Sequence, residues 1–173
     1  MIANLRRCSL TFALMLASLF LITACSEDKP ATLAAQQAAA IESGDECHLC
    51  GMLIGNFPGP KGQLYQRGQS QTKKFCSTRD LFAYLLDPEH QHSIQSVFVH
   101  DMAVTPWDHP DAETYIDARQ AWYVVGSSRK GAMGPTLASF SAKDAATAFA
   151  EEYGGQLYRF EQLDLSLVSQ MHF

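Results

Sequence analysis

The hydrophobic pattern from residue 44 onward switches between a period of two, typical of strands, and a period near 3.6, typical of helices. The segments Gly62–Gln69 and Thr72–Ser77 predict a hairpin that turns near Gly68–Ser70. Further strands are predicted at Ser93–Met102, Glu113–Ala118, Ala121–Ser127, Gly134–Phe140 and Gln156–Leu163.

A helix is predicted directly after the hairpin, over the stretch TRDLFAYLLDP. Ser77 or Thr78 can cap its first turn, Asp80 lies in that turn, and Pro88 marks its end. Four apolar side chains recur at helical spacing and give this helix one buried face: Leu81, Phe82, Leu85 and Leu86.

A second helix is predicted over SAKDAATAFAEEYGG, with Ser141 as its cap and Gly154–Gly155 as its terminator. The stretches FCSTRDLFAY and FSAKDAATAF share a pattern, because each ends a strand on Phe and then begins a helix. Each half of the chain also reads strand, strand, helix, strand. The sequence therefore predicts an α+β fold made of two small related units that pack together.

The first 25 residues carry a targeting signal instead of a fold element. Arg6 and Arg7 are followed by an apolar run from Leu10 to Ile22, which is too short for a spanning helix. The run ends in Ile22-Thr23-Ala24-Cys25, which resembles a bacterial lipobox whose cysteine receives the lipid. Ser26 after this cysteine resembles the sorting pattern for the outer membrane.

These features divide the chain into a signal peptide over residues 1–24, a lipid anchor and flexible tether over 25–43, and a globular domain over 44–173. The domain is expected to divide into halves of about 44–104 and 105–173. The tether is rich in Ala and Gln and lacks aromatic residues, so it can bury little apolar area.

Net charge excludes one class of partner. The whole chain carries a formal charge of −5, and removal of Arg6 and Arg7 with the signal peptide takes it to −7. An acidic chain without a basic cluster argues against nucleic-acid binding.

Candidate chemistry is concentrated in the stretch DECHLCGM. Cys47, His48, Cys50 and Met52 can all bind a metal, and the two cysteines can also form a disulfide. A redox Cys-x-x-Cys would open a helix, but Gly and Pro follow here. A structural zinc site would need a second closely spaced pair, which the sequence lacks, since Cys76 stands alone.

The methionine favours Cu(I), because a thioether is a good ligand for Cu(I) and a poor one for zinc, calcium or magnesium. Cys50 and Met52 project to the same side of an extended loop and form the expected core of the site, with Cys47 and His48 nearby. A residue from elsewhere should complete the ligand set. The candidates are, in order, Met102, Met133 and Cys76.

The ordered set of motifs resembles the NosL family of copper-binding lipoproteins, which accompany the maturation of nitrous oxide reductase. The matching stretches are CHLCGMLI, FPGPKGQ, FCSTRDLFAYLL, VHDM, DARQAWYVVGS and GAMGP. The resemblance implies a metallochaperone, not an enzyme, that binds Cu(I) at the periplasmic face of a membrane. It also implies an ABC-type membrane complex as partner and a fold similar to the units of organomercurial lyase.

Two other functions remain open on the residues alone. A thiol-dependent oxidoreductase or a lyase that splits carbon–metal bonds would use Cys47, Cys50 and Cys76 as thiolates, with Asp80 near Cys76. A purely structural lipoprotein would join Cys47 to Cys50 in a disulfide.

Overall fold

The computed structural model describes residues 36–171. The predicted signal peptide, the lipid-anchor residue Cys25 and the first part of the predicted tether lie outside the described residues. Within residues 36–171, no helix has the length and apolar character needed to cross a membrane.

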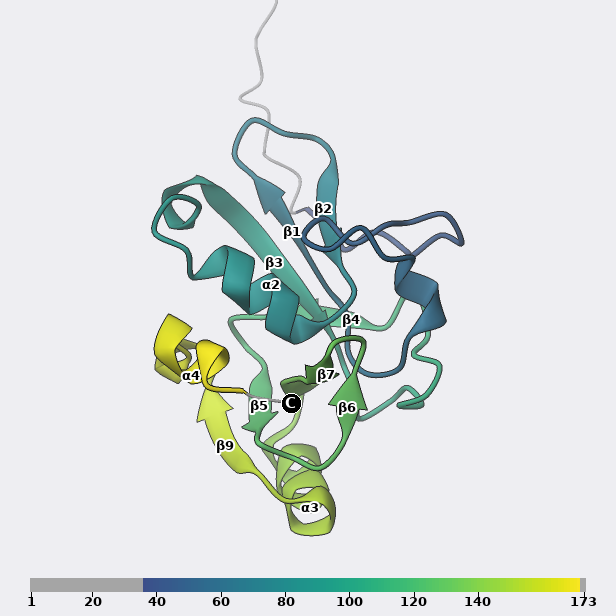
Figure 1. The fold of residues 1–173 in the computed structure, drawn as a ribbon, viewed down its shortest axis with the longest axis vertical. Helices are drawn as coiled ribbons and strands as arrows, with labels where there is room; N and C mark the ends of the chain where they lie inside the picture. Colours follow the sequence, from purple (N-terminus) through teal and green to yellow (C-terminus); the bar gives the residue numbers. More distant parts are fainter. Residues whose placement is uncertain (1–35, 172–173) are drawn as a thin grey trace, which may run out of the picture. The chain divides into compact units, whose positions relative to one another are not determined.

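The first half of the domain is a four-stranded antiparallel sheet in the order β2-β1-β3-β4 (Figure 1). The helix α2 (Thr78–Leu85) connects β2 to β3 and packs on β1 and β2. The strands are β1 (Gly62–Gln66), β2 (Thr72–Phe75), β3 (Ile94–His100) and β4 (Tyr115–Asp117).

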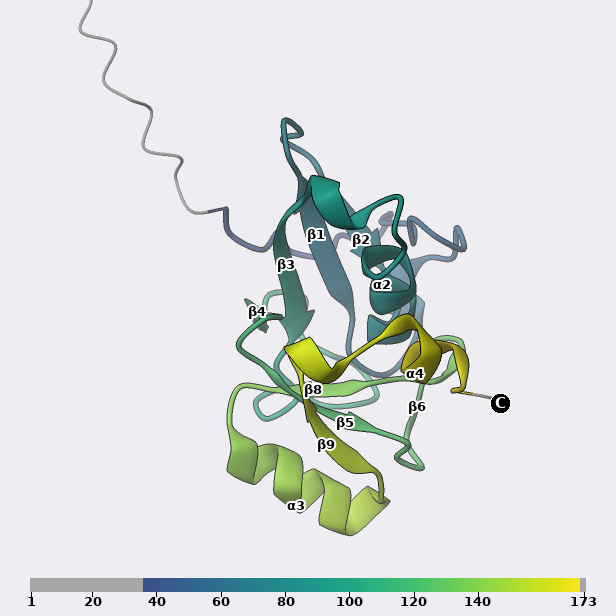
Figure 2. The same cartoon turned by 90° about the vertical axis from the view of Figure 1, so that its left-hand side faces the viewer.

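The second half repeats this arrangement with a three-stranded antiparallel sheet in the order β8-β5-β9 (Figure 2). The helix α3 (Lys143–Tyr153) connects β8 to β9 and packs on all three strands. The strands are β5 (Trp122–Val125), β8 (Ala138–Phe140) and β9 (Gln156–Arg159), with a short hairpin of β6 (Lys130–Gly131) and β7 (Gly134–Pro135) between them.

The α+β class predicted from the sequence is confirmed. In the first sheet β1 pairs with β2 and β3, and α2 connects these two strands. In the second sheet β5 pairs with β8 and β9, and α3 connects those two. Other features differ from expectation. The predicted strand 113–118 forms β4, which joins the first sheet although it lies beyond residue 104. The described part of the chain, residues 36–171, also forms a helix α4 (Leu165–Ser169) near its C-terminal end and three short 3-10 segments: η2 (Ile54–Asn56), η3 (Gln91–Ser93) and η4 (Phe160–Gln162).

Helix α2 begins where its cap was predicted. The Ser77 side chain accepts a hydrogen bond from the Asp80 backbone N–H at 3.0 Å, which satisfies one of the free donors of the first turn. The helix lies directly against β1, because a Cβ atom at Gly62 would come within 2.4 Å of Leu81. In α3 the cap residue is Ala142, not the predicted Ser141, and its side chain makes no capping hydrogen bond.

The two halves meet at a hydrogen-bonded contact between α2 and the segment that leads into β8. The Thr78 hydroxyl donates to the Leu137 carbonyl at 2.6 Å and lies 2.9 Å from the Thr136 hydroxyl. All three residues are buried. This contact fixes the start of α2 against the second half of the domain.

Residues 36–43 belong to the folded body, although the sequence predicted a flexible tether up to residue 43. Gln63 in β1 exchanges two hydrogen bonds with the backbone of Ala39, at 2.7 and 2.8 Å. The Lys74 ammonium donates to the Ala40 carbonyl at 2.7 Å. Polar side chains of the sheet hold this segment, and Ile41 packs against the main hydrophobic core, so the globular part begins earlier than Gly44.

Candidate metal centre

The Cys-x-x-Cys motif forms a tight hairpin turn on the outer edge of β2. The Met52 carbonyl accepts a hydrogen bond from the Cys47 N–H, and the Cys47 carbonyl accepts one from Gly51, both at 2.8 Å. Gly51 has a φ of 73°, which favours glycine. The His48 N–H donates to the Lys74 carbonyl at 2.8 Å and so fixes this turn to the sheet.

The third free cysteine reaches the turn from a different element. Cys76 lies between the end of β2 and the Ser77 cap of α2, and its sulfur is 3.5 Å from that of Cys50. The Asp80 carboxylate accepts a hydrogen bond from the Cys76 thiol at 3.3 Å, and its oxygen lies 3.7 Å from the Cys47 sulfur. The donor atoms of Cys47, Cys50, Cys76 and Asp80 all lie within 4.8 Å of one another; these four residues form the cysteine cluster.

The cysteine cluster is buried on one side and open on the other. Cys47 and Cys76 are almost completely buried, whereas Cys50 is exposed at the tip of the turn. All three are free thiols in the structure. A soft metal ion could therefore enter at Cys50 and be held by sulfur atoms that solvent does not reach.

Hydrogen bonding and burial shift the pKa values of the three thiols in different directions. The pKa of Cys47 falls to about 5, chiefly because its sulfur accepts a hydrogen bond from the Cys76 thiol. The pKa of Cys76 is raised, first by the same hydrogen bond, then by burial and by the Asp80 charge. Burial of the sulfur against its neighbours also raises the pKa of Cys50, although the residue as a whole is exposed. The lowered pKa of Cys47 favours its thiolate, the form that binds metal.

Lys61, the residue before β1, carries a buried ammonium. Lys61 precedes Gly62, which pairs with Phe75, so Lys61 lies across from Cys76 at the end of the ladder. Its side chain is buried and donates to the carbonyls of Phe57 and Pro58 at 2.6 and 2.9 Å. Burial lowers the pKa of Lys61 to about 8, and the charge of Cys76 opposes this shift.

The predicted methionines lie at different distances from this cluster in the fold. Met52 is half-buried and packs against the same hydrophobic core that contains Cys47 and Cys76. Met133, in the β6–β7 turn, also packs against that core, and its carbonyl accepts a hydrogen bond from Arg79. Met102 instead packs in the separate core of the second sheet, among Val124, Ala138, Phe140 and Ala146.

Cys76, which the sequence placed last among the candidates to complete the site, has its sulfur beside that of Cys50. Gly62 pairs with both Phe75 and Val99, so β1 lies between the end of β2, which precedes Cys76, and the end of β3, which precedes Met102. Two strand spacings amount to roughly 10 Å. Cys76 is the distant residue that the fold brings to the Cys-x-x-Cys turn.

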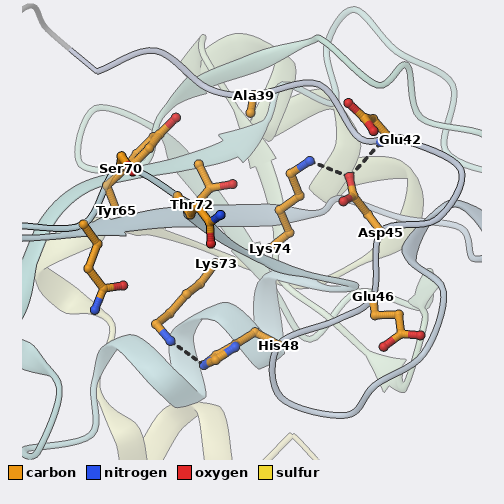
Figure 3. A pocket seen from close by; sticks show the side chains of 12 residues that line it. Ala39, Glu42, Asp45, Glu46, His48, Tyr65, Ser70, Thr72, Lys73 and Lys74 are labelled. Atoms are coloured by element: carbon orange, nitrogen blue, oxygen red, sulfur yellow. Dashed lines mark hydrogen bonds and ion pairs between the residues drawn. The ribbon is translucent and has the colours of Figure 1, made fainter.

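His48 points away from the cysteine cluster. Its Nε2 atom lies 2.8 Å from the Lys73 ammonium (Figure 3). Its ring packs edge-on against Tyr84. Both His48 and Lys73 line an open hollow of about 760 Å³ beside β2, in which Lys74 pairs with Asp45. Side chains of neighbouring residues in an extended turn face opposite sides, which separates His48 from Cys47.

Asp80 is the member of the cluster that the sequence alone did not place among the metal-site residues. The sequence identifies it as a first-turn acid and as a neighbour of Cys76. The signal that could have identified it as a ligand is the i, i+4 spacing of Cys76 and Asp80 across the helix start, which places two side chains on one side.

Three comparisons with known proteins agree with one another. A family model described as NosL matches residues 38–168. The copper-binding lipoprotein NosL of Stutzerimonas stutzeri is 43% identical over 151 residues, which are 87% of this chain and 78% of that protein. The copper-binding lipoprotein NosL of Achromobacter cycloclastes is 36% identical over 165 residues, covering 94% and 84%.

A solved structure is similar over most of the chain. The crystal structure of the copper chaperone NosL from Shewanella denitrificans superposes with a TM-score of 0.74 at 58% identity. The superposition covers 75% of this chain and 97% of that chain.

Proposed function

The chain belongs to the NosL family, and from this premise we propose that it is a membrane-anchored Cu(I) chaperone. It acts as a carrier and not as an enzyme, because its cargo leaves chemically unchanged. The observation that carries the proposal is the convergence of three free thiols within 4.8 Å, one of them exposed. Thiolate is a preferred ligand of Cu(I).

Cys50 is the proposed entry and exit ligand, because it is the exposed sulfur of the cluster. Cys47 and Cys76 supply buried sulfurs, and the Met52 thioether is the proposed weaker ligand at the rim. Met133 follows Met52, since it packs against the same core. His48 and Met102 are the least favoured of the candidates, because the first points to Lys73 and the second lies in the other core.

Such a site suits transfer by ligand exchange. An acceptor thiolate or thioether can approach Cys50 from solvent and form a bond to copper while the bond to Cys50 breaks, so the metal is never released as a free ion. The buried Lys61 ammonium offsets part of the negative charge that two thiolates leave on a Cu(I) complex.

The proposed recipient is the machinery that assembles the copper centres of nitrous oxide reductase, including an ABC-type membrane complex. Support for this partner comes from family membership and from the motifs given above. The proposed location is the periplasmic face of the outer membrane, with lipid on Cys25. The lipobox and the lipoprotein names of the relatives support the anchor, and Ser26 supports the choice of membrane.

The proposed architecture is a pair of related strand-strand-helix-strand units, similar to those of organomercurial lyase, that divide near residue 104. The common connection order of the two sheets supports the pairing. In this arrangement β4 is an addition to the first unit contributed by the linking segment.

The proposal is tested by titrating the full, reduced chain with Cu(I) under anaerobic conditions, against a colorimetric Cu(I) chelator. One equivalent should bind tightly, and Cys50→Ser should abolish tight binding. Met52→Leu should weaken binding without harming the fold, because the two side chains are close in volume. Sulfur scatterers at the copper absorption edge should accompany binding.

His92→Gln serves as a matched control, since His92 is exposed and lies in the η3 segment away from the cluster. Tight Cu(I) binding that survives Cys50→Ser would contradict the proposed site. Absence of stoichiometric binding in the unaltered chain would contradict the proposed function.

A further inference from the structure

The face of the first sheet that points away from α2 carries polar side chains. A Cβ atom at Gly62 would meet Leu81 of α2, so Gly62 faces that helix and the preceding residue, Lys61, faces the other way. His100 lies across from Lys61, since their backbones share a hydrogen bond of 3.1 Å, and Tyr115 pairs with His100. Lys61, His100 and Tyr115 therefore share one side of the sheet, which we call the back face.

The Lys61 ammonium is buried on the back face without a carboxylate partner. The residue is 2% exposed, and its ammonium donates to the backbone carbonyls of Phe57 and Pro58. No carboxylate within residues 36–171 forms an ion pair with it. Burial lowers the pKa of Lys61 to about 8, as expected where the positive charge is not fully balanced. Buried charges in proteins are normally paired, so this ammonium calls for a negative partner.

Two further polar groups of the back face lack a hydrogen-bond partner within the described residues. The His100 Nδ1 atom accepts from the Lys61 N–H at 3.3 Å, so the neutral ring carries its proton on Nε2, which is buried and unpartnered. The Tyr115 hydroxyl lies near the Gln63 amide but makes no hydrogen bond of adequate geometry. The His100 and Tyr115 rings are 4.2 Å apart between centroids. The back face thus has more donors than acceptors, a pattern that marks sites of bound water or ions.

A cavity of about 150 Å³ adjoins Lys61 on this face. Its walls include Ile41, Glu42 and Ser43 of the N-terminal segment and His109 of the loop 101–114. One water molecule occupies roughly 30 Å³, so the cavity can hold a small ion with a few waters. Glu42 is exposed at its edge, and a carboxylate there repels a doubly charged anion more strongly than a singly charged one.

We propose that this cavity binds a small monovalent anion, of the size of formate or chloride, with the Lys61 ammonium as its charge partner. Such an anion accepts hydrogen bonds and donates none, which matches a region with surplus donors. The His100 and Tyr115 donors add to the positive potential of the back face, and Glu42 selects against dianions. No covalent or redox step is involved. The inference goes beyond copper carriage and does not depend on it.

A bound anion would also hold the N-terminal segment against the sheet. The cavity has one wall from residues 41–43 and another from Lys61, so it exists only while the segment is attached. The attachment itself consists of polar contacts, from Gln63 to Ala39 and from Ile41 to the Ala112 carbonyl. A ligand that binds only the attached form stabilises it by mass action. The anion therefore opposes opening of the segment that joins the domain to the proposed lipid anchor.

The test titrates the full, reduced, metal-free chain in detergent with sodium formate at pH 6.5, where Lys61 is protonated. Amide NMR shifts should saturate and should be confined to residues 41–43, 57–61 and 109–112. Sodium sulfate, a dianion, should give no saturable shifts there. Lys61→Met should abolish saturation, and Glu42→Gln should tighten formate binding by about 3- to 5-fold, because it removes a nearby repulsive charge.

Two exposed residues outside the cavity lining supply matched controls. Lys130→Met removes a positive charge and Glu89→Gln removes a negative one, and both should leave formate binding unchanged. Hydrogen exchange gives a second measure. Formate should slow exchange of the Ala39 and Ile41 amides, which donate to Gln63 and Ala112, in the unaltered chain but not in Lys61→Met.

Formate shifts that rise without saturation would overturn the inference, as would saturable shifts that persist in a folded Lys61→Met chain. If Lys61→Met does not fold, Glu42→Gln decides, and unchanged or weaker formate binding in that variant contradicts the proposed site. Sulfate that binds as tightly as formate also contradicts it. A chain that binds formate as described but binds no Cu(I) would refute the proposed function and leave this inference standing.

Discussion

The two halves of the domain share the same order of strands and helix but carry different side chains at the start of the helix. In each, a strand ends on a phenylalanine, Phe75 or Phe140, and a helix begins three residues later. In each, that phenylalanine pairs with the central strand, at Gly62 in the first sheet and Trp122 in the second. The backbone around the start of α2 therefore has a counterpart without metal ligands at the start of α3.

When the two helix starts are aligned on Phe75 and Phe140, two residues of the cysteine cluster have no equivalent in the second half. Cys76 directly follows Phe75, whereas Ser141 follows Phe140. Asp80 is three residues after its cap Ser77, whereas Ala145 is three residues after Ala142. The first half adds the Cys-x-x-Cys turn on the edge of β2. The comparison shows that the strand-strand-helix-strand backbone alone does not make a metal site. The site also needs ligand side chains at the helix start and the Cys-x-x-Cys turn that covers them.

The largest expected effect on metal binding comes from replacing Cys76 by serine, the residue type at the matching position of the second half. Cys76→Ser should lower Cu(I) affinity by at least about 10-fold, because even partners outside the ligand set commonly contribute that much to a metal site. Ser141→Ala, a change at the matching position of the second half, is the control and should leave affinity unchanged. Anaerobic chelator competition measures both, and equal effects of the two would remove the distinction between the halves.

The next effect concerns how closely each helix approaches its central strand. Gly62→Ala should destabilise the fold by about 3 kcal/mol, at the upper end for an overpacked core, because its Cβ would overlap Leu81. Gly55→Ala is the control, since no heavy atom outside its immediate neighbours lies within 4 Å of the added Cβ. Urea unfolding reports both. A small effect at Gly62 would show that α2 can move away from β1.

The third prediction concerns the pH dependence of stability, which His100 at the end of β3 should control. His100 is buried, and its counterpart in the second half is Phe160, directly after β9. Burial, with the nearby Lys61 charge, lowers the pKa of His100 to about 3, against 6.5 for an ordinary histidine. The unfolded chain therefore takes up the proton first as pH falls. The stabilisation is complete above pH 6.5 and is lost progressively toward pH 3.

This linkage amounts to about 2 kcal/mol between about pH 7 and pH 5. Urea unfolding at the two pH values should show that His100→Gln removes this part of the pH dependence. His92→Gln, at an exposed site, should retain it. An unchanged pH dependence in His100→Gln would mean that the buried ring is not the group that titrates.

The smallest effect tests the unequal caps. Ser77→Ala should cost about 1 kcal/mol, because it leaves the Asp80 N–H without its partner. Ala142→Ser should stabilise α3 by up to a similar amount, because it provides a cap where the structure has none. Thermal unfolding of the two variants should shift in opposite directions, and a loss of stability in Ala142→Ser would show that the two helix starts differ in geometry.

Local signals were enough to predict much of the fold. Ser77, Asp80 and the apolar spacing of α2 lie within one short segment, so the sequence located both the helix and its cap. The partner of β4 could not be predicted in this way. Its three residues pair with β3 across the loop 101–114, and a pairing of that length depends on packing instead of propensity.

The site was predicted only in part for the same physical reason. Cys47, Cys50 and Met52 lie in one stretch and could be chosen directly. Cys76 ranked last among the candidates because its position beside the helix cap suggested a local role. In the structure, the hydrogen bond from His48 to Lys74 holds the Cys-x-x-Cys turn beside Cys76. Met102 ranked first because a strand end seemed free to meet the turn, yet β1 lies between them.

The attachment of residues 36–43 to the sheet limits how far the cysteine cluster can travel from its membrane. With lipid on Cys25, ten residues (26–35) separate the anchor from the folded body, instead of the eighteen of the predicted tether (26–43). At about 3.5 Å per residue as an upper bound, ten residues span at most roughly 35 Å, against roughly 60 Å for eighteen. That length is less than the thickness of a bilayer with its headgroups, which is about 40–45 Å. If Cys25 carries the lipid, as proposed, residue 36 stays within roughly 35 Å of the anchor, so an acceptor must come close to the membrane surface to receive the metal.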